Sequence, residues 1–487
     1  MPTSTGMPLL MTYLSVLTWA IFIAYAMLIV TLIVAVLSEN RNPLKALGWV
    51  MALLLFPIGG AILYFVFGRS MRNVKMISRR NRRKLLNAES HHPMPKLSKN
   101  LSAENRQRIM LGYSVAEALV YPDNTIEVAN DGQSMFDSLF ADLRTATKYI
   151  NLQFYIIAND FLGRELAKIL IDRAHAGVKI RVIYDYVGSF GSHSLKLFNR
   201  LRAHGVEVHS FFRIQFPEKL GRLNWRNHRK AVIIDGRIGY IGGINVAQRY
   251  IDGGQFGGWR DMAVRITGPG VAALQHNFAI DWKFMGNELL TDEAADITPI
   301  PGSISNVPVQ IIASGPTNRW GNTHMLFIKA ISGAKRRIFI QTPYFLPSEG
   351  LLTALQCAAL AGIDVRVMMP RRSDSAVLTN ASSSYIEESL LAGIKIYLYE
   401  AGMLHGKVLL VDDDFVTLGS TNFDYRSFEH NFEENIVMYS HDVNAEIERL
   451  FRADMNDCTQ VKLSEWHRRP TMSKARESLC RLLSPIL

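Results

Sequence analysis

The stretch Asn227–Gly236 reads NHRKAVIIDG, and a second stretch, Leu404–Asp413, reads LHGKVLLVDD. Both contain His, one residue, Lys, four apolar residues and Asp. In each copy six further residues lead to Gly, then Gly or Ser, one residue and Asn. The full pattern is therefore His-x-Lys-x4-Asp-x6-Gly-[Gly/Ser]-x-Asn. Because the pattern occurs twice with identical spacing, it is too specific to arise by chance.

The chain around the two copies is also repeated. The first half runs from YINLQFYIIAND (Tyr149–Asp160) to AGVKIRVIYD (Ala176–Asp185), and the second from RIFIQTPYFLPSEG (Arg337–Gly350) to AGIDVRVMMP (Ala361–Pro370). The order in both is strand, helix, strand, helix, strand and hairpin. Apolar strands separated by longer periodic segments predict mixed sheets covered by helices. The expected fold class is a duplicated α/β unit.

Two long apolar runs precede the repeats. Leu9–Leu37 contains no charged residue, and about 20 such residues span a bilayer. The second run, Ala46–Gly68, contains FPIGG (Phe56–Gly60), which predicts a bend. A signal peptide is disfavoured because no basic residue precedes the first run and the run is too long. We therefore expect a membrane hairpin.

The predicted organisation has four parts. Residues 1–85 form the hairpin, with spans at about 9–37 and 46–68, and a basic juxtamembrane segment. A linker at 86–110 leads to the first α/β domain at 111–300 and the second at 301–487. Lys and Arg cluster directly after the second apolar run, at Arg69, Arg72, Lys75, Arg79, Arg80, Arg82, Arg83 and Lys84. The positive-inside rule then places the C-terminal part in the cytoplasm.

The net charge of +11 at pH 7 is compatible with nucleic acid or with an anionic membrane as partner. The position of the basic cluster beside an apolar span favours lipid headgroups, each charge near the surface contributing about 1 kcal/mol. The three cysteines lack CxxC spacing, which argues against a disulfide framework and a zinc site.

The paired motifs suggest chemistry on a phosphodiester. Lysines and amides can surround non-bridging oxygens and neutralise the charge of the transition state. One neutral imidazole can attack phosphorus while a protonated one donates to the leaving alkoxide. The lysines already supply positive charge, so neither a metal nor another cofactor is expected. The candidates in the motifs are His228, Lys230, Asn245, His405, Lys407 and Asn422.

Carboxylates near the motifs are further candidates. A nucleophilic imidazole needs its tautomer fixed, usually by a carboxylate on the far nitrogen. Asp261 and Glu433 follow the motifs of the first and second halves and are candidates for this role. Asp235 and Asp412, inside the motifs, are candidate catalytic groups, although hydrogen bonding within the hairpin turn is the favoured interpretation.

With these residues, the chain resembles the phospholipase D superfamily, and within it the bacterial cardiolipin synthases. The resemblance covers nearly the whole chain, including the apolar pair of segments. The segments that carry it are NLQFYI, NWRNHRKAVIIDG, GGIN, WRD, QTPYFLP, LHGKVLLVDD, GSTNFDYRS and the closing RLLSPIL. One departure is Gly243, where many members have Ser, as this chain does at Ser420.

The resemblance implies two tandem phospholipase D-like domains that form one active site behind a transmembrane hairpin. It implies that His228 is the nucleophile, and that His405 is the acid and later the base. It also carries over a set of supporting roles: Lys230, Lys407, Asn245 and Asn422 as phosphate ligands, Asp261 and Glu433 as imidazole partners, and Ser420 as a supporting group.

The implied reaction is a transfer of the phosphatidyl group from one phosphatidylglycerol to another, giving cardiolipin and glycerol through a phosphohistidine. The implied location is the bacterial inner membrane, multi-pass, with phosphatidylglycerol and cardiolipin as lipid partners and no nucleic acid. The oligomeric state is left open, a homodimer included.

Three alternatives remain open. The motifs handle only the phosphodiester, so a hydrolytic phospholipase D or a transferase using another donor, such as phosphatidylethanolamine, fits them equally. A membrane-tethered nuclease would use the positive charge, but the apolar runs argue against it. An inactive scaffold is disfavoured because both motifs are intact.

Overall fold

The structure, a computed structural model, describes residues 6–39, 43–72, 74–88, 101–190, 194–213, 224–255, 257–291, 300 and 302–485. Residues 89–100 of the predicted linker and the last two residues of RLLSPIL lie outside these ranges. The chain divides into two compact units, the first made of residues 1–73 and 214–224, and the second of 74–213 and 225–487. Each is described separately.

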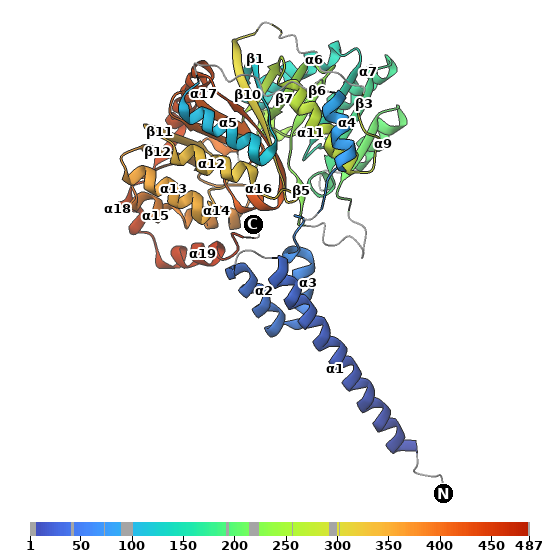
Figure 1. Cartoon of the computed structure of the whole chain (residues 1–487). Coiled ribbons are helices and arrows are strands. Elements are labelled where there is room, and N and C mark those ends of the chain that lie inside the picture. Colours follow the sequence, from blue (N-terminus) through green and yellow to red (C-terminus); the bar gives the residue numbers. More distant parts are fainter. Residues whose placement is uncertain are drawn as a thin grey trace. The chain divides into compact units, whose positions relative to one another are not determined.

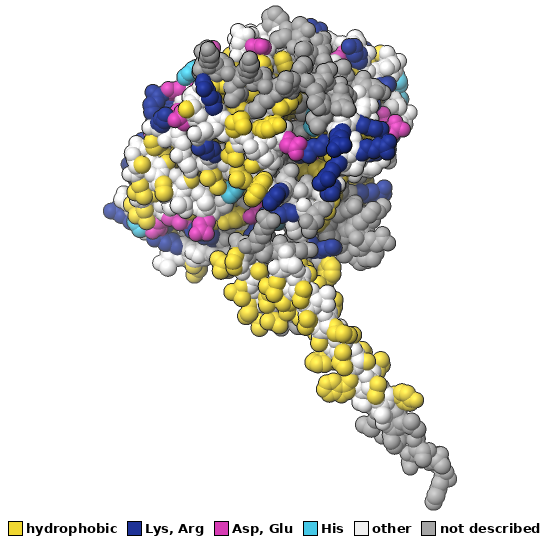
Figure 2. Space-filling model, in the orientation of Figure 1, with side chains coloured by type: hydrophobic (Ala, Val, Ile, Leu, Met, Phe, Trp, Pro, Cys, Tyr) yellow, Lys and Arg dark blue, Asp and Glu magenta, His cyan; other side chains and the backbone are white. Residues whose placement is uncertain are grey.

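The first unit is an apolar helical hairpin. α1 (Gly6–Glu39) is followed by α2 (Pro43–Leu55), α3 (Pro57–Leu63) and a π-helical turn, η1 (Tyr64–Gly68). Ile29, Leu32 and Val36 of α1 pack against Leu53 and Tyr64. Elsewhere large apolar side chains are exposed on this unit, including Trp19, Phe22 and Leu37, and Figure 2 shows them as a yellow surface. Such a surface needs an apolar solvent or a partner to cover it.

The second apolar run is broken where the sequence predicts. α2 ends at Leu55, Phe56 has φ −133° and ψ 68°, and Pro57 starts α3. Proline disfavours helical geometry in the residue before it and has no N–H to continue the ladder. Among the described residues, one helix segment, Thr12–Ser38, is long and apolar enough to cross a bilayer. The interrupted run 46–68 does not meet that length.

The second unit is built on one 16-stranded mixed sheet (Figure 1). Its order is β18-β13-β12-β11-β15-β16-β17-β10-β1-β9-β7-β6-β2-β3-β4, with β5 paired to β17. The first-half strands are β1 (Val120–Ala129), β2 (Tyr149–Phe154), β3 (Lys179–Asp185), β4 (Glu207–Phe211), β5 (Arg226–Asn227), β6 (Ala231–Ile234), β7 (Ile238–Gly242), β8 (Gly258–Arg260) and β9 (Ala263–Thr267). The second-half strands are β10 (Ile304–Ser314), β11 (Arg337–Gln341), β12 (Asp364–Pro370), β13 (Lys395–Tyr399), β14 (Gly402–Leu404), β15 (Val408–Val411), β16 (Phe415–Gly419), β17 (Asn431–Met438) and β18 (Cys458–Gln460). Of these strands, β8 and β14 lie outside the large sheet and form a separate two-stranded sheet.

Helices cover both halves of the sheet (Figure 1). Those before β10 are α4 (Arg79–Ala88), α5 (Ala103–Ala116), α6 (Gly132–Thr145), α7 (Phe161–His175), α8 (Tyr186–Phe190), α9 (Leu195–Ala203), α10 (Arg249–Asp252) and α11 (Val271–Phe284). Those after it are α12 (Asn322–Ser332), α13 (Glu349–Leu360), α14 (Ala376–Ser383), α15 (Ile386–Leu391), α16 (Tyr425–Glu429), α17 (His441–Asp454), the 3-10 turn η3 (Met455–Asp457), α18 (Leu463–His467) and α19 (Thr471–Arg481).

The two halves have the same strand order outward from the centre of the sheet. β1 and β10 pair antiparallel there, and each is followed outward by the equivalent strands of its own half. The pairs β2–β3–β4 and β11–β12–β13 are parallel, and the remaining pairs along each half are antiparallel. The predicted duplicated α/β fold is confirmed. The predicted boundaries between its domains stay a prediction.

One segment of the predicted linker packs on the second half. Ile109 of α5 belongs to the second-half core. The Arg108 guanidinium donates to the Ala330 carbonyl at 3.2 Å, and the Asn105 amide donates to the Asp414 carbonyl at 3.0 Å. Figure 1 shows α5 beside α12. The segment 103–116 therefore precedes the first half in sequence but belongs structurally to the second.

Candidate active site

A short parallel strand pair fixes the first histidine against the other half of the chain. β5 runs parallel to the start of β17, with Asn227 opposite Phe432. The His228 N–H donates to the Phe432 carbonyl at 2.9 Å. One residue further along this register, His228 comes opposite Glu433.

The second histidine is held in the same way. β14 runs parallel to β8, with Leu404 opposite Arg260. The His405 N–H donates to the Arg260 carbonyl at 2.7 Å. One residue further along, His405 comes opposite Asp261. Each half thus supplies a histidine and the strand that receives the histidine of the other half.

The imidazole–carboxylate pairs are therefore crossed between the halves. His228 Nδ1 lies 3.0 Å from Glu433 Oε2, and His405 Nδ1 lies 2.6 Å from Asp261 Oδ2. All four side chains are buried. Since the Nδ1 atoms face the carboxylates, the Nε2 atoms remain for chemistry. The sequence predicts the two carboxylates but not which histidine each one holds.

Both motif lysines are buried beside the histidines. Lys230 Nζ donates to the His228 carbonyl at 2.6 Å. Lys407 Nζ lies 2.7 Å from His405 Nδ1 and 3.6 Å from Asp261 Oδ2. Buried ammonium groups are costly unless an anion compensates them. Two of them beside two imidazoles make a site suited to a phosphate.

Burial disfavours the positively charged forms of the lysines and histidines of the site. It lowers the pKa of Lys230 to about 7, an effect that Glu433 opposes. Burial, assisted by the Lys407 ammonium, lowers the pKa of His405 to about 4. Burial also lowers the pKa of His228, against the attraction of Glu433. The two carboxylates thus do not fully compensate the positive charge that the lysines and histidines could carry.

The pKa of each partner carboxylate is also lowered, which for an acid favours the charged form. Burial alone would raise the pKa of Glu433, but His228 and Lys230 bring it below the usual value. Lys407 and His405 do the same for Asp261. Both carboxylates are therefore ionised and hold the imidazoles in one tautomer.

The two motif asparagines are not equivalent. Asn245 donates to the Tyr250 hydroxyl at 2.7 Å and accepts from the Ile156 N–H at 3.1 Å. Burial raises the pKa of Asp424 to about 6, and a hydrogen bond from the Asn422 side chain opposes this shift. The Asn422 Oδ1 is buried and has no hydrogen-bond partner among the described residues. Their role as phosphate ligands stays a prediction.

The position that departs from the family pattern has a structural explanation. Ser420 Oγ donates to Glu433 Oε2 at 2.5 Å and accepts from the Glu434 N–H at 2.9 Å. At the equivalent Gly243, a side-chain carbon would overlap the Asp261 carboxylate. Glu433 is therefore held by the Ser420 hydroxyl. In the first half, the Asp261 carboxylate occupies the space that a side chain at position 243 would need.

The motif aspartates lie far from the histidines. They directly follow β6 and β15, and the four residues of each strand, about 13 Å of extended chain, separate them from the motif lysines. The Asp235 carboxylate accepts from the backbone N–H groups of residues 147–149 at 2.8–2.9 Å. The Asp412 carboxylate accepts from those of 335–337 at 2.8–3.2 Å. Both have positive φ, 55° and 53°, which Asp and Asn tolerate. We therefore do not retain the catalytic assignment of Asp235 and Asp412.

We expect Asp235→Asn and Asp412→Asn to weaken folding while leaving the chemistry intact. Asn keeps the backbone conformation but has one acceptor oxygen for three N–H groups. The free energy of unfolding should fall by about 1–2 kcal/mol, with kcat/KM unchanged within about twofold. Denaturant unfolding of the detergent-solubilised full chain and turnover at low temperature measure the two quantities. A loss of turnover without a loss of stability would restore a catalytic role.

Aromatic side chains border the two imidazoles, and the motifs do not contain them. The Tyr155 ring centroid lies 5.0 Å from that of His228. The ring centroids of Tyr250 and Trp259 lie 5.8 and 5.2 Å from that of His405. The available sequence signals were the tyrosine ending NLQFY and the tryptophan of WRD. These rings occupy space directly beside the two imidazoles.

The residue between His228 and Lys230 points away from the site. Arg229 Nη1 lies 2.8 Å from Asp281 Oδ1, and Arg229 Nε donates to the Glu433 carbonyl at 3.2 Å. This buried pair fixes the backbone between the two functional side chains. It connects the motif to α11 and to β17 of the other half.

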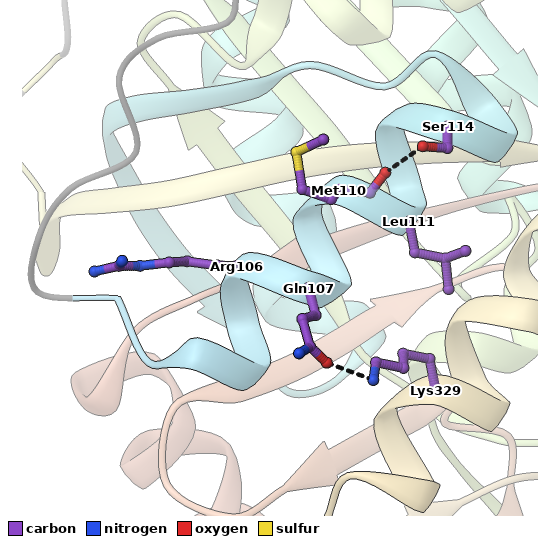
Figure 3. A pocket seen from close by; sticks show the side chains of 6 residues that line it. All are labelled: Arg106, Gln107, Met110, Leu111, Ser114 and Lys329. Carbon is purple, nitrogen blue, oxygen red and sulfur yellow. Dashed lines mark hydrogen bonds between the residues drawn. The ribbon is translucent and has the colours of Figure 1, made fainter.

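A surface hollow of about 470 Å³ lies elsewhere, against α5 and α12 (Figure 3). Its lining residues are Arg106, Gln107, Met110, Leu111, Ser114 and Lys329. Lys329 Nζ donates to Gln107 Oε1 at 2.6 Å. None of the predicted site residues lines it, so it is not where the phosphodiester chemistry is expected.

Comparisons with known proteins agree with this geometry. The cardiolipin synthase PLD-like domain matches residues 139–282 and 327–455, and the phospholipase D-nuclease N-terminal domain matches residues 26–69. A cardiolipin synthase of Geobacillus kaustophilus (strain HTA426) is 36% identical over 474 residues, covering 96% of this chain and 94% of the relative. The major cardiolipin synthase ClsA of Bacillus subtilis (strain 168) is 37% identical over 468 residues, covering 93% and 96%.

A solved structure shows the fold independently. The crystal structure of phosphatidylserine synthase from Haemophilus influenzae Rd KW20 has a TM-score of 0.59 at 14% identity, covering 79% of this chain and 100% of that one. At this identity the likeness concerns the fold alone. Since these two synthases, both above 30% identity, align along more than nine-tenths of both chains, and the PLD-like domain matches both halves, this chain belongs to the cardiolipin synthases of the phospholipase D superfamily.

Proposed function

We propose that this enzyme transfers the phosphatidyl group of one phosphatidylglycerol to the glycerol headgroup of a second. The products are cardiolipin and free glycerol. The observation that carries the proposal is the pair of crossed imidazole–carboxylate contacts, flanked by two buried lysines, in a member of this family. Its substrates are phospholipids, and the choice of phosphatidylglycerol as both donor and acceptor is part of the proposal.

In the first step, His228 Nε2 attacks phosphorus and the bond from phosphorus to the glycerol oxygen breaks. His405 gives its Nε2 proton to that oxygen, and glycerol leaves. In the second step, the headgroup hydroxyl of another phosphatidylglycerol attacks the phosphohistidine while His405 takes its proton. The bond between phosphorus and His228 then breaks, and both imidazoles return to their starting forms.

The two lysines neutralise the negative charge of the phosphate oxygens in both steps. The phosphate in turn compensates the buried positive charge of the lysines. An imidazole with a pKa of about 4 is neutral at pH 7, so His405 needs the phosphate to hold an acidic proton. Negative charge beside Lys230, Lys407 and His405 raises the pKa of each. Phosphate binding should therefore be coupled to proton uptake.

This coupling predicts a definite pH dependence. Binding of inorganic phosphate at pH 7.5 should take protons from the buffer, because the pKa of free Lys230 is about 7 and rises in the complex. A group whose pKa rises on binding favours the complex at low pH, so affinity should fall as pH increases above about 7. Calorimetric titration in two buffers of different ionisation enthalpy measures the uptake. Lys230→Arg, which stays charged, should reduce it, whereas proton release in the unmodified enzyme would contradict the charge balance.

The reaction itself is tested with purified full-length enzyme in phosphatidylglycerol vesicles. We expect equal amounts of cardiolipin and glycerol by mass spectrometry, and none with His228→Ala. Mainly phosphatidic acid would identify a hydrolase, and a different product lipid in mixed vesicles would identify another phosphatidyltransferase. Cleavage of DNA or RNA that disappears in His228→Ala would identify a nuclease.

Membrane association follows from the apolar helix and the family, and its topology is part of the proposal. We place α1 across the bilayer, the interrupted segment 46–68 as the returning arm, and the catalytic unit in the cytoplasm, because Lys and Arg are concentrated after residue 68. Labelling of single cysteines at position 6, before the apolar span, and at position 79 with an impermeant reagent tests this. Both positions should react only after the inner face is opened if the chain crosses twice, whereas reaction of position 6 from the outer face would show a single crossing.

A further inference from the structure

A row of apolar side chains lies exposed on α19, near the end of the chain. Met472, Leu479 and Leu482 are 73%, 66% and 76% exposed, and Leu483 is 42% exposed. Their spacing of three, four or seven residues places them along one side of a helix and its final turn. Single exposed leucines are normal, but a continuous row on one element indicates a contact.

The other side of α19 is fixed to the protein. Cys480 packs against the second-half core. The Arg481 guanidinium lies 4.1 Å over the Tyr385 ring, and its Nη1 lies 2.6 Å from Glu388 Oε1. A different face of α19, the one that carries Cys480 and Arg481, already packs against the second half. The exposed apolar row therefore lies on the side of the helix that faces away from the core.

The charges around the row are strongly biased. Residues 461–487 contain six Lys or Arg and two Glu. Glu477 is turned inward and bound by Arg469 Nη2 at 2.9 Å. Glu387 of α15 lies 3.2 Å from His467 Nδ1 and is likewise occupied. Arg476 is exposed within the apolar row. The carboxylates near the row are thus engaged by partners on the protein, and Lys474 Nζ donates to the His467 carbonyl at 3.1 Å, so Arg476 is the positive charge that lies exposed among the apolar side chains.

We propose that α19 is an interfacial helix that lies in the surface of an anionic bilayer. Met472, Leu479 and Leu482 enter the headgroup–acyl boundary, while Arg476 contacts lipid phosphates. A bilayer fits this face through its charge complementarity, and the apolar helix of the same chain keeps a bilayer close by. The contact gives the catalytic unit its own attachment to the surface that holds the lipids. The inference goes beyond the proposed reaction and does not require it.

Spin labels on the full chain test the contact directly. Single cysteines replace Leu479 and, as a matched control, Leu360, which is 73% exposed at the end of α13. The background carries Cys357→Ser, Cys458→Ala and Cys480→Ala, and both proteins are reconstituted in phosphatidylglycerol vesicles. Accessibility is measured to oxygen, which concentrates in the bilayer, and to a water-soluble nickel complex. The ratio of oxygen to nickel accessibility should be on the order of tenfold higher at 479 than at 360.

Three results are distinguishable. Equal accessibility at the two positions would overturn the proposal, since the membrane tether alone acts on both. Shielding of position 479 from both reagents would also overturn it and indicate a protein occupant, such as a second copy of the chain. Loss of the difference in phosphatidylcholine vesicles, and in Arg476→Glu, would support the electrostatic part. The labels report bilayer contact even if the lipid is not turned over, so failure here differs from failure of the proposed reaction.

Discussion

His228→Ala should abolish the covalent step, and His405→Ala should block only the steps that need proton transfer. With phosphatidylglycerol, both variants should lose at least about 10⁴-fold in kcat/KM, since residues acting as a unit are each indispensable. A phosphodiester carrying a nitrophenyl group separates them, because nitrophenolate leaves without a proton. His405→Ala should then release about one nitrophenolate per enzyme in a burst and stop. His228→Ala should release none.

The burst also assigns the nucleophile, which the similarity of the two halves leaves to the family resemblance. Intact-mass measurement of His405→Ala after the burst should show one added phosphodiester group, and peptide mapping should place it on His228. A burst in His228→Ala, with the added mass on His405, would reverse the roles. Full turnover in His405→Ala would rule out the two-histidine mechanism.

Glu433→Gln and Asp261→Asn should impair opposite steps, each the step of the histidine in the other half. An amide no longer holds the imidazole in the correct tautomer or stabilises its charged form, which costs on the order of 10²–10⁴-fold. Glu433→Gln should slow the nitrophenolate burst, because Glu433 holds His228. Asp261→Asn should leave the burst fast and slow the following turnover, because Asp261 holds His405.

Asp412→Asn is the matched control, since it exchanges the same groups at a carboxylate whose hydrogen bonds, among the described residues, come from the backbone N–H groups of residues 335–337. It should retain both phases. If Glu433→Gln spared the burst while Asp261→Asn removed it, each carboxylate would act within its own half, and the crossed arrangement would be incorrect. The burst and the following turnover should both be measured over a range of pH. A loss of folded enzyme would reduce both by the same factor, whereas a wrong imidazole tautomer would reduce only one of them.

The repeated fold could be predicted because its signals are local. Strands such as KIRVIY and DVRVMM, and the helices between them, are encoded in the periodicity of neighbouring residues. The interruption at Phe56 is equally local, since Pro57 acts on the residue directly before it. The packing of α5 on the second half was not predicted. The sequence of α5 shows an apolar residue at Ile109, but it does not indicate which half of the sheet that residue packs against.

The sequence by itself determined the repeat, the apolar N-terminal helix and the identity of the two histidines, two lysines and two carboxylates. The tertiary structure decided that His228 faces Glu433 and His405 faces Asp261. These contacts join positions 205 and 144 residues apart. Their partners follow from the register of β5 on β17 and of β14 on β8, and strand register across halves depends on how whole sheets pack. It also decided that Asp235 and Asp412 bind backbone N–H groups, because only the folded chain brings residues 147–149 and 335–337 to the hairpin turns.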